Sequence, residues 1–307
     1  ENNFNGNGVK LDANLVLTDQ AIKGKFAYTT PNFAYSDRSL TTSLESTSID
    51  KEKDYGYKSS LNKILIGTSF EQYENFYLSP SFSIVQENLT TTAKASANYK
   101  KQEGSYFDAL LNYSISYNTL NSSFRPSSGL VSIFSQELPI LSDGYNLVNG
   151  YQITGYKEVA DDSILAMGIY TRAVNTLQSD VDARVSKRMF LPSSKLRGFE
   201  SGKIGPKDGK DFVGGNYMAS FNTSLTLPFL FPTYDNVDFS IFFDAANVWH
   251  VDYSKNVDQS NSVRSSTGLG LNLITPVGPL SFSLTQPITK ADGDVTETVR
   301  FNLGTTF

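Results

Sequence analysis

The chain has 307 residues with a formal net charge of −5 at pH 7, contains no Cys and has a single His, His250. The absence of Cys excludes a disulfide framework, thiol catalysis and Cys-ligated metal sites, and one His excludes a multi-histidine zinc site. The chain also lacks the basic field that a general nucleic-acid binder needs. We therefore expect no metal, no cofactor and no nucleic-acid partner.

Hydropathy argues against membrane-spanning helices but is compatible with a transmembrane barrel. The mean hydropathy is −0.27, and no stretch approaches the ~18–20 consecutive apolar residues that a membrane-spanning helix needs. A barrel strand carries its apolar residues on alternate positions, so its average hydropathy stays low.

Alternation of apolar and polar residues dominates the chain and predicts strands rather than helices. After an expected turn at residues 1–8, the alternation begins at Val9 and Leu11. Several segments are long for a soluble sheet, where ~5–6 residues is typical, and they suit tilted strands that cross a bilayer. In chain order the fourteen predicted strands are 8–18, 21–31, 39–49, 57–68, 76–87, 105–118, 129–138, 147–157, 163–173, 213–227, 236–249, 263–274, 279–288 and 296–306.

The predicted connections alternate between short turns on one side and longer loops on the other, which is the pattern of outer-membrane barrels. The long connections are 88–104, 174–211 and 250–262, and residues 90–103 could form a short surface helix. The fold class predicted is therefore all-β, a transmembrane antiparallel β-barrel that occupies residues 1–307 as a single domain. The alternative is a soluble β-sandwich or lipocalin-like barrel, whose strands alternate equally well.

Groupings of residues that would indicate catalysis are weak. Asp161 and Asp162 form a carboxylate pair in a short turn, where solvated turn residues are the simpler interpretation. His250 lies at a strand end without an evident Ser and carboxylate partner, which nucleophilic catalysis would require. We expect no catalytic residues, and a protein that is not an enzyme.

The connection 174–211 is the strongest functional feature, because structureless connections of that length are usually functional or disordered. It carries Arg197, Gly198 and Phe199, which suit a loop directed into the lumen of a barrel. Gly permits a tight turn, Arg can pair with a carboxylate, and Phe supplies apolar surface. The polar-facing position Asp244 of a later strand is the partner that we predict for Arg197. An ordinary solvated surface loop is the alternative.

An ordered series of motifs resembles the bacterial surface-antigen barrel superfamily, which contains the outer-membrane protein assembly factors. The strong similarity spans residues 188–307, and residues 1–187 are similar in layout. The motifs are Leu-Arg-Gly-Phe at 196–199, Ile-Gly-Pro at 204–206, Gly-Gly-Asn at 214–216, Phe-Phe-Asp-Ala-Ala-Asn-Val-Trp at 242–249, Ser-Thr-Gly-Leu-Gly-Leu-Asn at 266–272, Pro-Val-Gly-Pro-Leu at 276–280, Gln-Pro-Ile at 286–288 and the final Phe-Asn-Leu-Gly-Thr-Thr-Phe.

The resemblance implies a sixteen-strand barrel preceded by POTRA domains. This chain has no POTRA segment, and we expect it to lack the first two strands, so that the remaining fourteen form an open sheet. The family also has a Glu in its twelfth strand that reaches toward the Arg of the loop, and the aligned position here is Ser224. That substitution would leave Asp244 as the main partner of Arg197.

The function implied by the resemblance is insertion and folding of client β-barrel proteins into the bacterial outer membrane. The implied partners are unfolded client proteins, outer-membrane lipids and the accessory lipoproteins of an assembly complex. In the family, clients pair with a weak lateral seam between the first and last strands. The residues of the last strand that we assign to this seam are Val299, Phe301, Leu303, Gly304 and Phe307.

Two alternatives to assembly remain. One is a translocation barrel, either TamA-like or a two-partner secretion transporter. The other is a passive porin-like barrel, which would carry a constriction loop rich in charges in place of the Arg-Gly-Phe loop.

Overall fold

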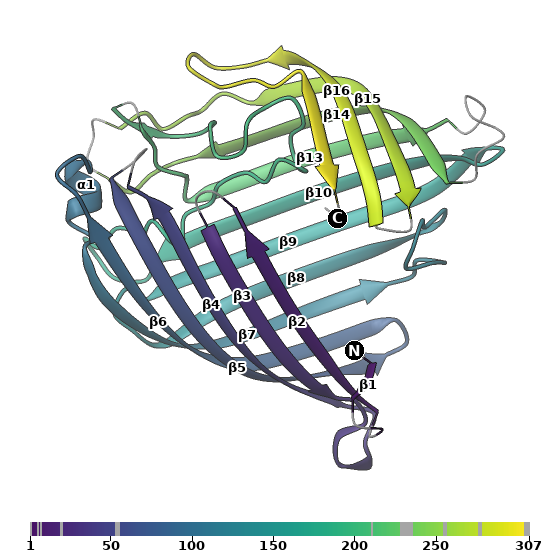
Figure 1. Cartoon of the computed structure of the whole chain (residues 1–307), viewed down its shortest axis with the longest axis horizontal. Coiled ribbons are helices and arrows are strands. Elements are labelled where there is room, and N and C mark those ends of the chain that lie inside the picture. The colour runs from purple at the N-terminus through teal and green to yellow at the C-terminus, as the bar shows by residue number, and fades with distance from the viewer. Residues whose placement is uncertain are drawn as a thin grey trace. The chain divides into compact units, whose positions relative to one another are not determined.

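A computed structural model describes the chain over residues 2–4, 6, 8–18, 21–52, 56–209, 211–227, 236–253, 257–275 and 278–303. The fold is all-β, with one antiparallel sheet of fifteen strands and a separate two-stranded sheet (Figure 1). In the described residues, no helix is long and apolar enough to cross a membrane.

The large sheet follows the order of the chain, so each strand pairs with the strands before and after it. The order is β1 (Asn2–Phe4), β2 (Val9–Leu17), β3 (Ala21–Thr30), β4 (Ser39–Lys51), β5 (Tyr57–Tyr73), β6 (Phe76–Thr91), β7 (Gly104–Asn118), β8 (Gly129–Ser142), β9 (Asn146–Ala160), β10 (Ser163–Thr176), β13 (Tyr217–Thr226), β14 (Val237–Trp249), β15 (Arg264–Thr275), β16 (Gly278–Thr289) and β17 (Val299–Leu303). The order ends at β1 and β17, and no pairing among the described residues joins these two strands.

Three short elements lie in the connections. They are the 3-10 turn η1 (Phe33–Tyr35), the helix α1 (Ala97–Lys100), and the hairpin of β11 (Lys207–Asp208) and β12 (Asp211–Phe212). Helix α1 lies within the predicted helical segment 90–103 and is only one turn long. The Ser96 side chain caps it by accepting a hydrogen bond from the Tyr99 amide, as N-cap residues do.

All fourteen predicted strands are present, and two ends of the chain differ from the prediction. Asn2–Phe4, predicted as part of a turn, forms the additional strand β1 and pairs with β2. The last strand begins at Val299 rather than at residue 296, because Thr296 forms an isolated bridge with Phe199 of the long loop.

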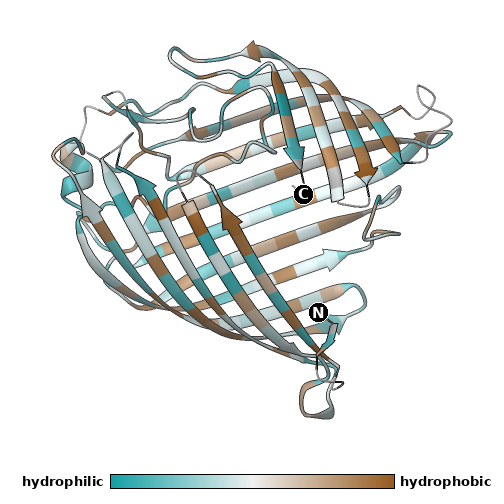
Figure 2. Cartoon of the chain, viewed as in Figure 1, coloured by the Kyte–Doolittle hydropathy of each residue, from teal (hydrophilic) through white to brown (hydrophobic). Residues whose placement is uncertain are grey.

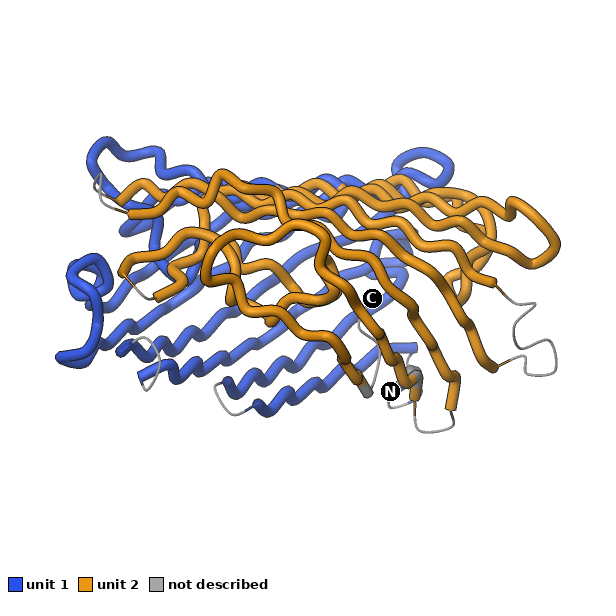
Figure 3. Tube along the Cα trace, turned by 90° about the horizontal axis from the view of Figure 1, so that it is seen from above, with its two compact units in different colours: residues 1–116, 134–149, 174–188 blue, residues 117–133, 150–173, 189–307 orange. Residues whose placement is uncertain are grey.

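The chain divides into two compact units (Figure 3). Unit 1 comprises residues 1–116, 134–149 and 174–188, and unit 2 comprises residues 117–133, 150–173 and 189–307. The long connection after β10 therefore contributes its first part to unit 1 and its second part to unit 2.

In unit 1, hydrophilic and hydrophobic residues alternate along the strands, as the bands of colour in Figure 2 show. In β6 the side chains of Ser83, Val85 and Glu87 are buried, whereas Phe82 and Ile84 are about 40 % exposed. The buried face is thus mixed or polar, and the exposed face is apolar. That is the reverse of a soluble sheet and suits strands whose outer face meets lipid.

Unit 2 follows the same rule. On β14, Ser240, Phe242 and Asp244 are buried beneath the long loop, whereas Ile241 and Phe243 are exposed. Phe301 of β17 is 54 % exposed and packs against Phe282 of β16 with ring centroids 4.8 Å apart. We call the two sides the loop-covered face and the exposed face.

The exposed face of unit 2 yields a test of its lipid environment. Phe282→Arg should destabilise the protein in phospholipid vesicles by up to about 2–4 kcal/mol, the cost of an Arg on the lipid face near the bilayer midplane. Ser281→Arg is the matched control, because Ser281 lies one residue away on the opposite face. Urea unfolding of both variants in vesicles measures the difference, and equal costs would contradict a lipid-facing Phe282.

Candidate functional site

The candidate site is the segment of the long loop that packs on the loop-covered face of unit 2. Arg197 Nε and Nη2 donate hydrogen bonds to the Asp244 carboxylate at 2.7 and 2.8 Å, and the Arg197 backbone N–H donates to Asp244 Oδ2 at 3.1 Å. The Asp244 side chain is fully buried, and that of Arg197 is 24 % exposed. The structure therefore brings the two predicted partners together in a bidentate pair, the strong form of Arg–carboxylate contact.

Phe242 completes the Arg197 environment. The Arg197 guanidinium carbon lies 3.4 Å from the centre of the Phe242 ring, within the range of a cation–π interaction. Phe242 and Asp244 are two residues apart in β14, so they project from the same face of the strand. The strand thus supplies both an anion and an aromatic face for one guanidinium.

Gly198 and Phe199 fix the path of the loop against β15 and β16. Gly198 has a φ of +88°, and a Cβ there would lie 3.2 Å from the Thr285 side chain. Any larger residue would therefore be strained in backbone and would push against β16. Phe199 is buried, and the Ser266 hydroxyl donates to the Arg197 carbonyl. The loop backbone thus finds its hydrogen-bond partners on the strands below it.

Asn222, and not Ser224, is the β13 side chain that contacts Asp244. Asn222 is the register partner of Asp244, whereas Ser224 lies opposite Phe242. The Asn222 amide donates to Asp244 Oδ1 at 2.8 Å and to the Lys195 carbonyl at 2.9 Å. Ser224, which the resemblance aligns with the family's Glu, lies two residues away on the same face. A neutral amide therefore joins Asp244 to the loop in this chain.

Lys195 lies two residues before Arg197. Its ammonium is 5.0 Å from the centre of the Tyr170 ring. Burial lowers the pKa of Lys195, and the Asp244 carboxylate partly offsets that effect. Asp244 therefore pairs directly with Arg197 and also favours the charged form of Lys195.

A second cluster of buried charges lies in unit 1, and the sequence analysis did not predict it. Arg184 forms a hydrogen-bonded ion pair with Asp108 of β7 and lies 3.5 Å from the Glu87 carboxylate of β6. Asp108 also accepts a hydrogen bond from Ser142, and Glu87 accepts one from Ser186 at 2.7 Å. All three charged side chains are at most 5 % exposed. Arg184 thus anchors the first part of the loop to unit 1.

The remaining candidate residues form no site. His250 is exposed and stacks on Tyr217 with ring centroids 5.3 Å apart. Asp161 and Asp162 form the exposed turn between β9 and β10. Among the residues that the structure describes, no group of three His, Asp or Glu side chains is arranged to hold a metal ion.

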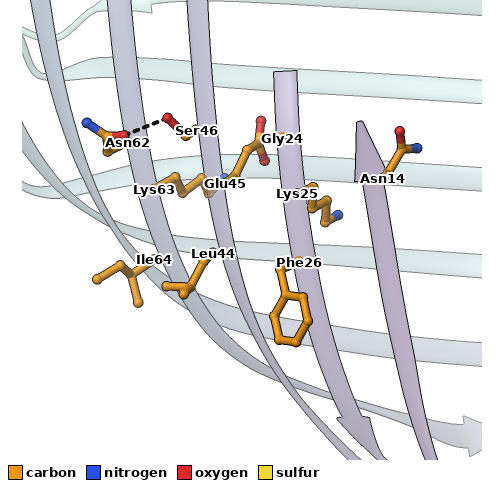
Figure 4. A pocket seen from close by; sticks show the side chains of 10 residues that line it. All are labelled: Asn14, Gly24, Lys25, Phe26, Leu44, Glu45, Ser46, Asn62, Lys63 and Ile64. Carbon is orange, nitrogen blue, oxygen red and sulfur yellow. Dashed lines mark hydrogen bonds between the residues drawn. The ribbon is translucent and has the colours of Figure 1, made fainter. Parts of the chain in front are cut away.

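A shallow pocket of about 450 Å³ lies on β2 to β5 of unit 1 (Figure 4). Lys25, Glu45 and Lys63 occupy neighbouring positions of one cross-strand row, and the Ser46 hydroxyl donates to Asn62 at 2.8 Å. Opposite charges on adjacent strands partly cancel one another. The pocket therefore presents no concentrated charge to a ligand.

The predicted seam residues lie only partly in the described chain. Val299 and Phe301 project from the exposed face of β17, with exposures of 66 % and 54 %. Leu303 ends β17, and Gly304 and Phe307 lie outside the described residues. β17 pairs with β16 only from Leu280↔Leu303 to Leu284↔Val299, whereas β16 continues to Thr289.

The sequence profile of the Omp85 superfamily domain matches residues 3–307. The chain belongs to the Omp85 superfamily. Among Omp85 relatives, the chain is 27% identical over 218 residues to the outer membrane protein assembly factor BamA of Neorickettsia risticii. The aligned region covers 69% of this chain and 29% of that protein. The chain is 26% identical over 224 residues to a SAM50-like protein of Schizosaccharomyces pombe, covering 66% of this chain and 45% of the relative.

The Omp85 fold is shared with solved structures. The crystal structure of BamA from Haemophilus ducreyi lacking POTRA domains 1–3 matches with a TM-score of 0.87 and 24% identity, over 98% of this chain and 65% of that one. CdiB from Escherichia coli matches with a TM-score of 0.59 and 13% identity, over 98% and 56%. The chain thus spans less than two thirds of the length of these relatives, and its fold is that of an outer-membrane β-barrel.

The Arg197 pair yields a graded test. Arg197→Ala should loosen the loop and cost roughly 3 kcal/mol, because it leaves the Asp244 charge buried without its cation. Arg197→Lys should recover only part of this, since Lys lacks the bidentate fork. Hydrogen exchange of the amides at 197–199 measures the loosening. Arg125→Ala, which removes an exposed ion pair with Asp238 of the same unit, should leave those amides unchanged; equal exchange in all variants would refute the anchoring.

For the buried charge cluster of unit 1, we predict a larger loss of stability than for the Arg197 pair. Arg184→Met should destabilise the protein by about 3–5 kcal/mol, because two buried carboxylates lose their common cation. Lys187→Met is the matched control: Lys187 pairs with Glu137 at 3.6 Å in a partly exposed position, and such a pair contributes about 0–1 kcal/mol. Urea unfolding in detergent compares the two, and a small effect of Arg184→Met would show that the cluster is not an anchor.

Proposed function

We propose that this chain inserts and folds client β-barrel proteins into the bacterial outer membrane, through a lateral seam that includes β17. The names of its relatives support this proposal, since they include outer membrane protein assembly factors and the sorting assembly machinery 50 kDa subunit of Saccharomyces cerevisiae. The proposed partners are unfolded outer-membrane proteins, the surrounding lipids and the accessory lipoproteins of an assembly complex.

The short pairing of the last strand is the observation that carries the proposal. In the described residues, which end at Leu303, β17 pairs with β16 over five residues, whereas β15 pairs with β16 along nearly its whole length. Within this part of the chain, fewer backbone hydrogen bonds hold β17 to β16 than hold β15 to β16. In lipid, an incoming strand can satisfy its amides only by pairing with another strand, and an edge strand offers the template for that pairing.

The direction of the β17 amides follows from the ladder. The Thr285 N–H donates to the Thr298 carbonyl at 2.8 Å, so 285 and 298 form a hydrogen-bonded pair. Because hydrogen-bonded and non-bonded pairs alternate in antiparallel sheets, the Phe301 N–H points away from β16. That amide belongs to the edge that a client would use.

In this mechanism no covalent bond is made or broken, so we propose that the protein is not an enzyme. The chain lowers the barrier to insertion by presenting backbone donors and acceptors at the level of the hydrocarbon. The loop that carries Arg197 supports the face behind these strands, because its backbone is hydrogen-bonded to Ser266 and Asp244.

The test is insertion of a urea-unfolded client barrel into vesicles that contain the full-length protein. We expect folding, measured by protease protection of the client, to be at least about tenfold faster than in empty vesicles, equivalent to ~1.4 kcal/mol of barrier. Phe301→Pro should remove most of this gain, because it deletes an edge donor. Phe301→Ala, which keeps the amide, should retain it.

Two outcomes would contradict the proposal. No acceleration by the unaltered protein would favour the passive porin-like barrel. Passage of a soluble exoprotein through the vesicle wall, without client insertion, would favour the translocation barrel, the other alternative that the sequence leaves open.

A further inference from the structure

Residues 290–298, which connect β16 to β17, leave the sheet and join the candidate loop; we call this segment the strap. Register pairing of β17 with β16 stops at Val299, although β16 extends five residues further, to Thr289. Only the end of the strap stays on β16, where the Thr285 N–H donates to the Thr298 carbonyl. The backbone before this point pairs elsewhere.

The strap pairs with the loop directly after Arg197. The Glu297 N–H donates to the Gly198 carbonyl at 3.0 Å, the Glu200 N–H donates to the Val295 carbonyl at 2.9 Å, and the Val295 N–H donates to the Lys203 carbonyl at 3.4 Å. The Phe199↔Thr296 bridge lies between these bonds. The strap thus links the candidate loop to the seam strand β17 by backbone pairing.

One buried ion pair ties the strap to the sheet. Arg264, the first residue of β15, donates from Nε and Nη2 to the two Asp294 carboxylate oxygens at 2.9 and 3.0 Å. The Arg264 side chain is 2 % exposed and the Asp294 side chain is fully buried. Asp294 belongs to the strap, so this pair spans 30 residues of chain.

Both side chains are held in one orientation by further hydrogen bonds. Arg264 Nη1 donates to Asn247 Oδ1 at 2.6 Å and to the Ser260 hydroxyl and the Ser262 carbonyl at 2.7 Å. Asp294 Oδ2 also accepts from the Ala291 N–H at 2.7 Å, which closes a tight turn at the start of the strap. A planar guanidinium with fixed partners on both sides is a rigid attachment point.

We propose that the Arg264–Asp294 pair is a clamp that positions the strap against the loop, and through it fixes the start of the seam strand β17. The position of the strap does not depend on the proposed function. Only the expected effect of the clamp on client insertion rests on that function. Arg264 and Asp294 are positioning residues, since they act on β17 through the strap and contact no client themselves.

The clamp holds the strap where its two edges have different partners. The N–H groups of Val295 and Glu297 and the Val295 carbonyl pair with the loop, whereas the Thr298 carbonyl accepts from Thr285 of β16. Because alternate residues of an extended segment point to opposite edges, the strap contacts the loop and the sheet at the same time. Loss of the clamp therefore frees the strap from the loop and leaves the start of the seam strand held by fewer contacts.

The experiment measures hydrogen exchange and client insertion on the full-length protein in vesicles, with Asp294→Asn as the main variant. We expect exchange of the Glu200, Val295 and Glu297 amides to rise by at least about tenfold, as for a locally opened segment, and insertion to slow several-fold. Arg264→Lys should fall between this variant and the unaltered protein. Asp238→Asn, which removes an exposed ion pair of unit 2, is the matched control. It should change neither the exchange of these amides nor the rate of client insertion.

An engineered disulfide tests whether the clamp acts by positioning the strap or by stabilising the whole protein. The chain contains no Cys, so Lys203→Cys with Val295→Cys creates a single thiol pair across the strap and the loop, at positions whose backbones are already hydrogen-bonded. In the Asp294→Asn background, oxidation should restore insertion, and reduction should remove the effect.

Each outcome is decisive for one of the two proposals. Unchanged strap amides in Asp294→Asn, or failure of the oxidised disulfide to restore insertion while the β14 amides stay protected, would overturn the clamp. If the unaltered protein inserts no client, the proposed function fails, and the exchange pattern still tests the clamp.

Discussion

Backbone hydrogen bonding in lipid is the constraint on which this structure depends. No water is available in the hydrocarbon to satisfy a free N–H or C=O, so each strand must pair with neighbours on both sides. The order β1 to β17 meets this requirement for every interior strand. The two terminal strands, β1 and β17, are the exception, because each pairs with only one neighbour among the described residues. The function that we propose, which needs a free strand edge, uses the edge of β17.

The same constraint explains why the loop-covered faces are rich in polar side chains. A loop that is buried against a sheet cannot pair all of its own backbone groups, so the strands below must supply partners. Asp244 accepts the Arg197 N–H, Ser266 donates to the Arg197 carbonyl, and Asn222 donates to the Lys195 carbonyl. An apolar face would have left these groups without hydrogen bonds. Burial of charge here specifies one position of the loop more than it adds stability.

Alternation in the sequence predicted the strands of the sheet well, because residues two positions apart in a strand project from the same face. The same signal supported Asp244 as the partner of Arg197, since Asp244 lies on the polar face of its strand. It did not single out Asn222, the partner of Asp244 across the strands, and the resemblance pointed only to Ser224, which lies opposite Phe242. Nor could alternation reveal the Arg184 cluster, whose carboxylates lie 76 and 97 residues away in sequence. Such contacts depend on the path of a loop that carries no periodicity.

The start of the last strand is a second feature that alternation alone did not predict. Alternation predicts a strand that begins at residue 296. In the structure Thr296 and Glu297 pair with the loop, and the Thr298 carbonyl keeps a hydrogen bond to β16. Alternation does not show which backbone a residue pairs with, so the position of these residues must come from a contact outside the pattern. The Arg264–Asp294 pair is such a contact, because it joins the strap to the first residue of β15. In the clamp that we propose, the start of the seam strand is thereby fixed by a salt bridge that the surrounding protein shields from solvent.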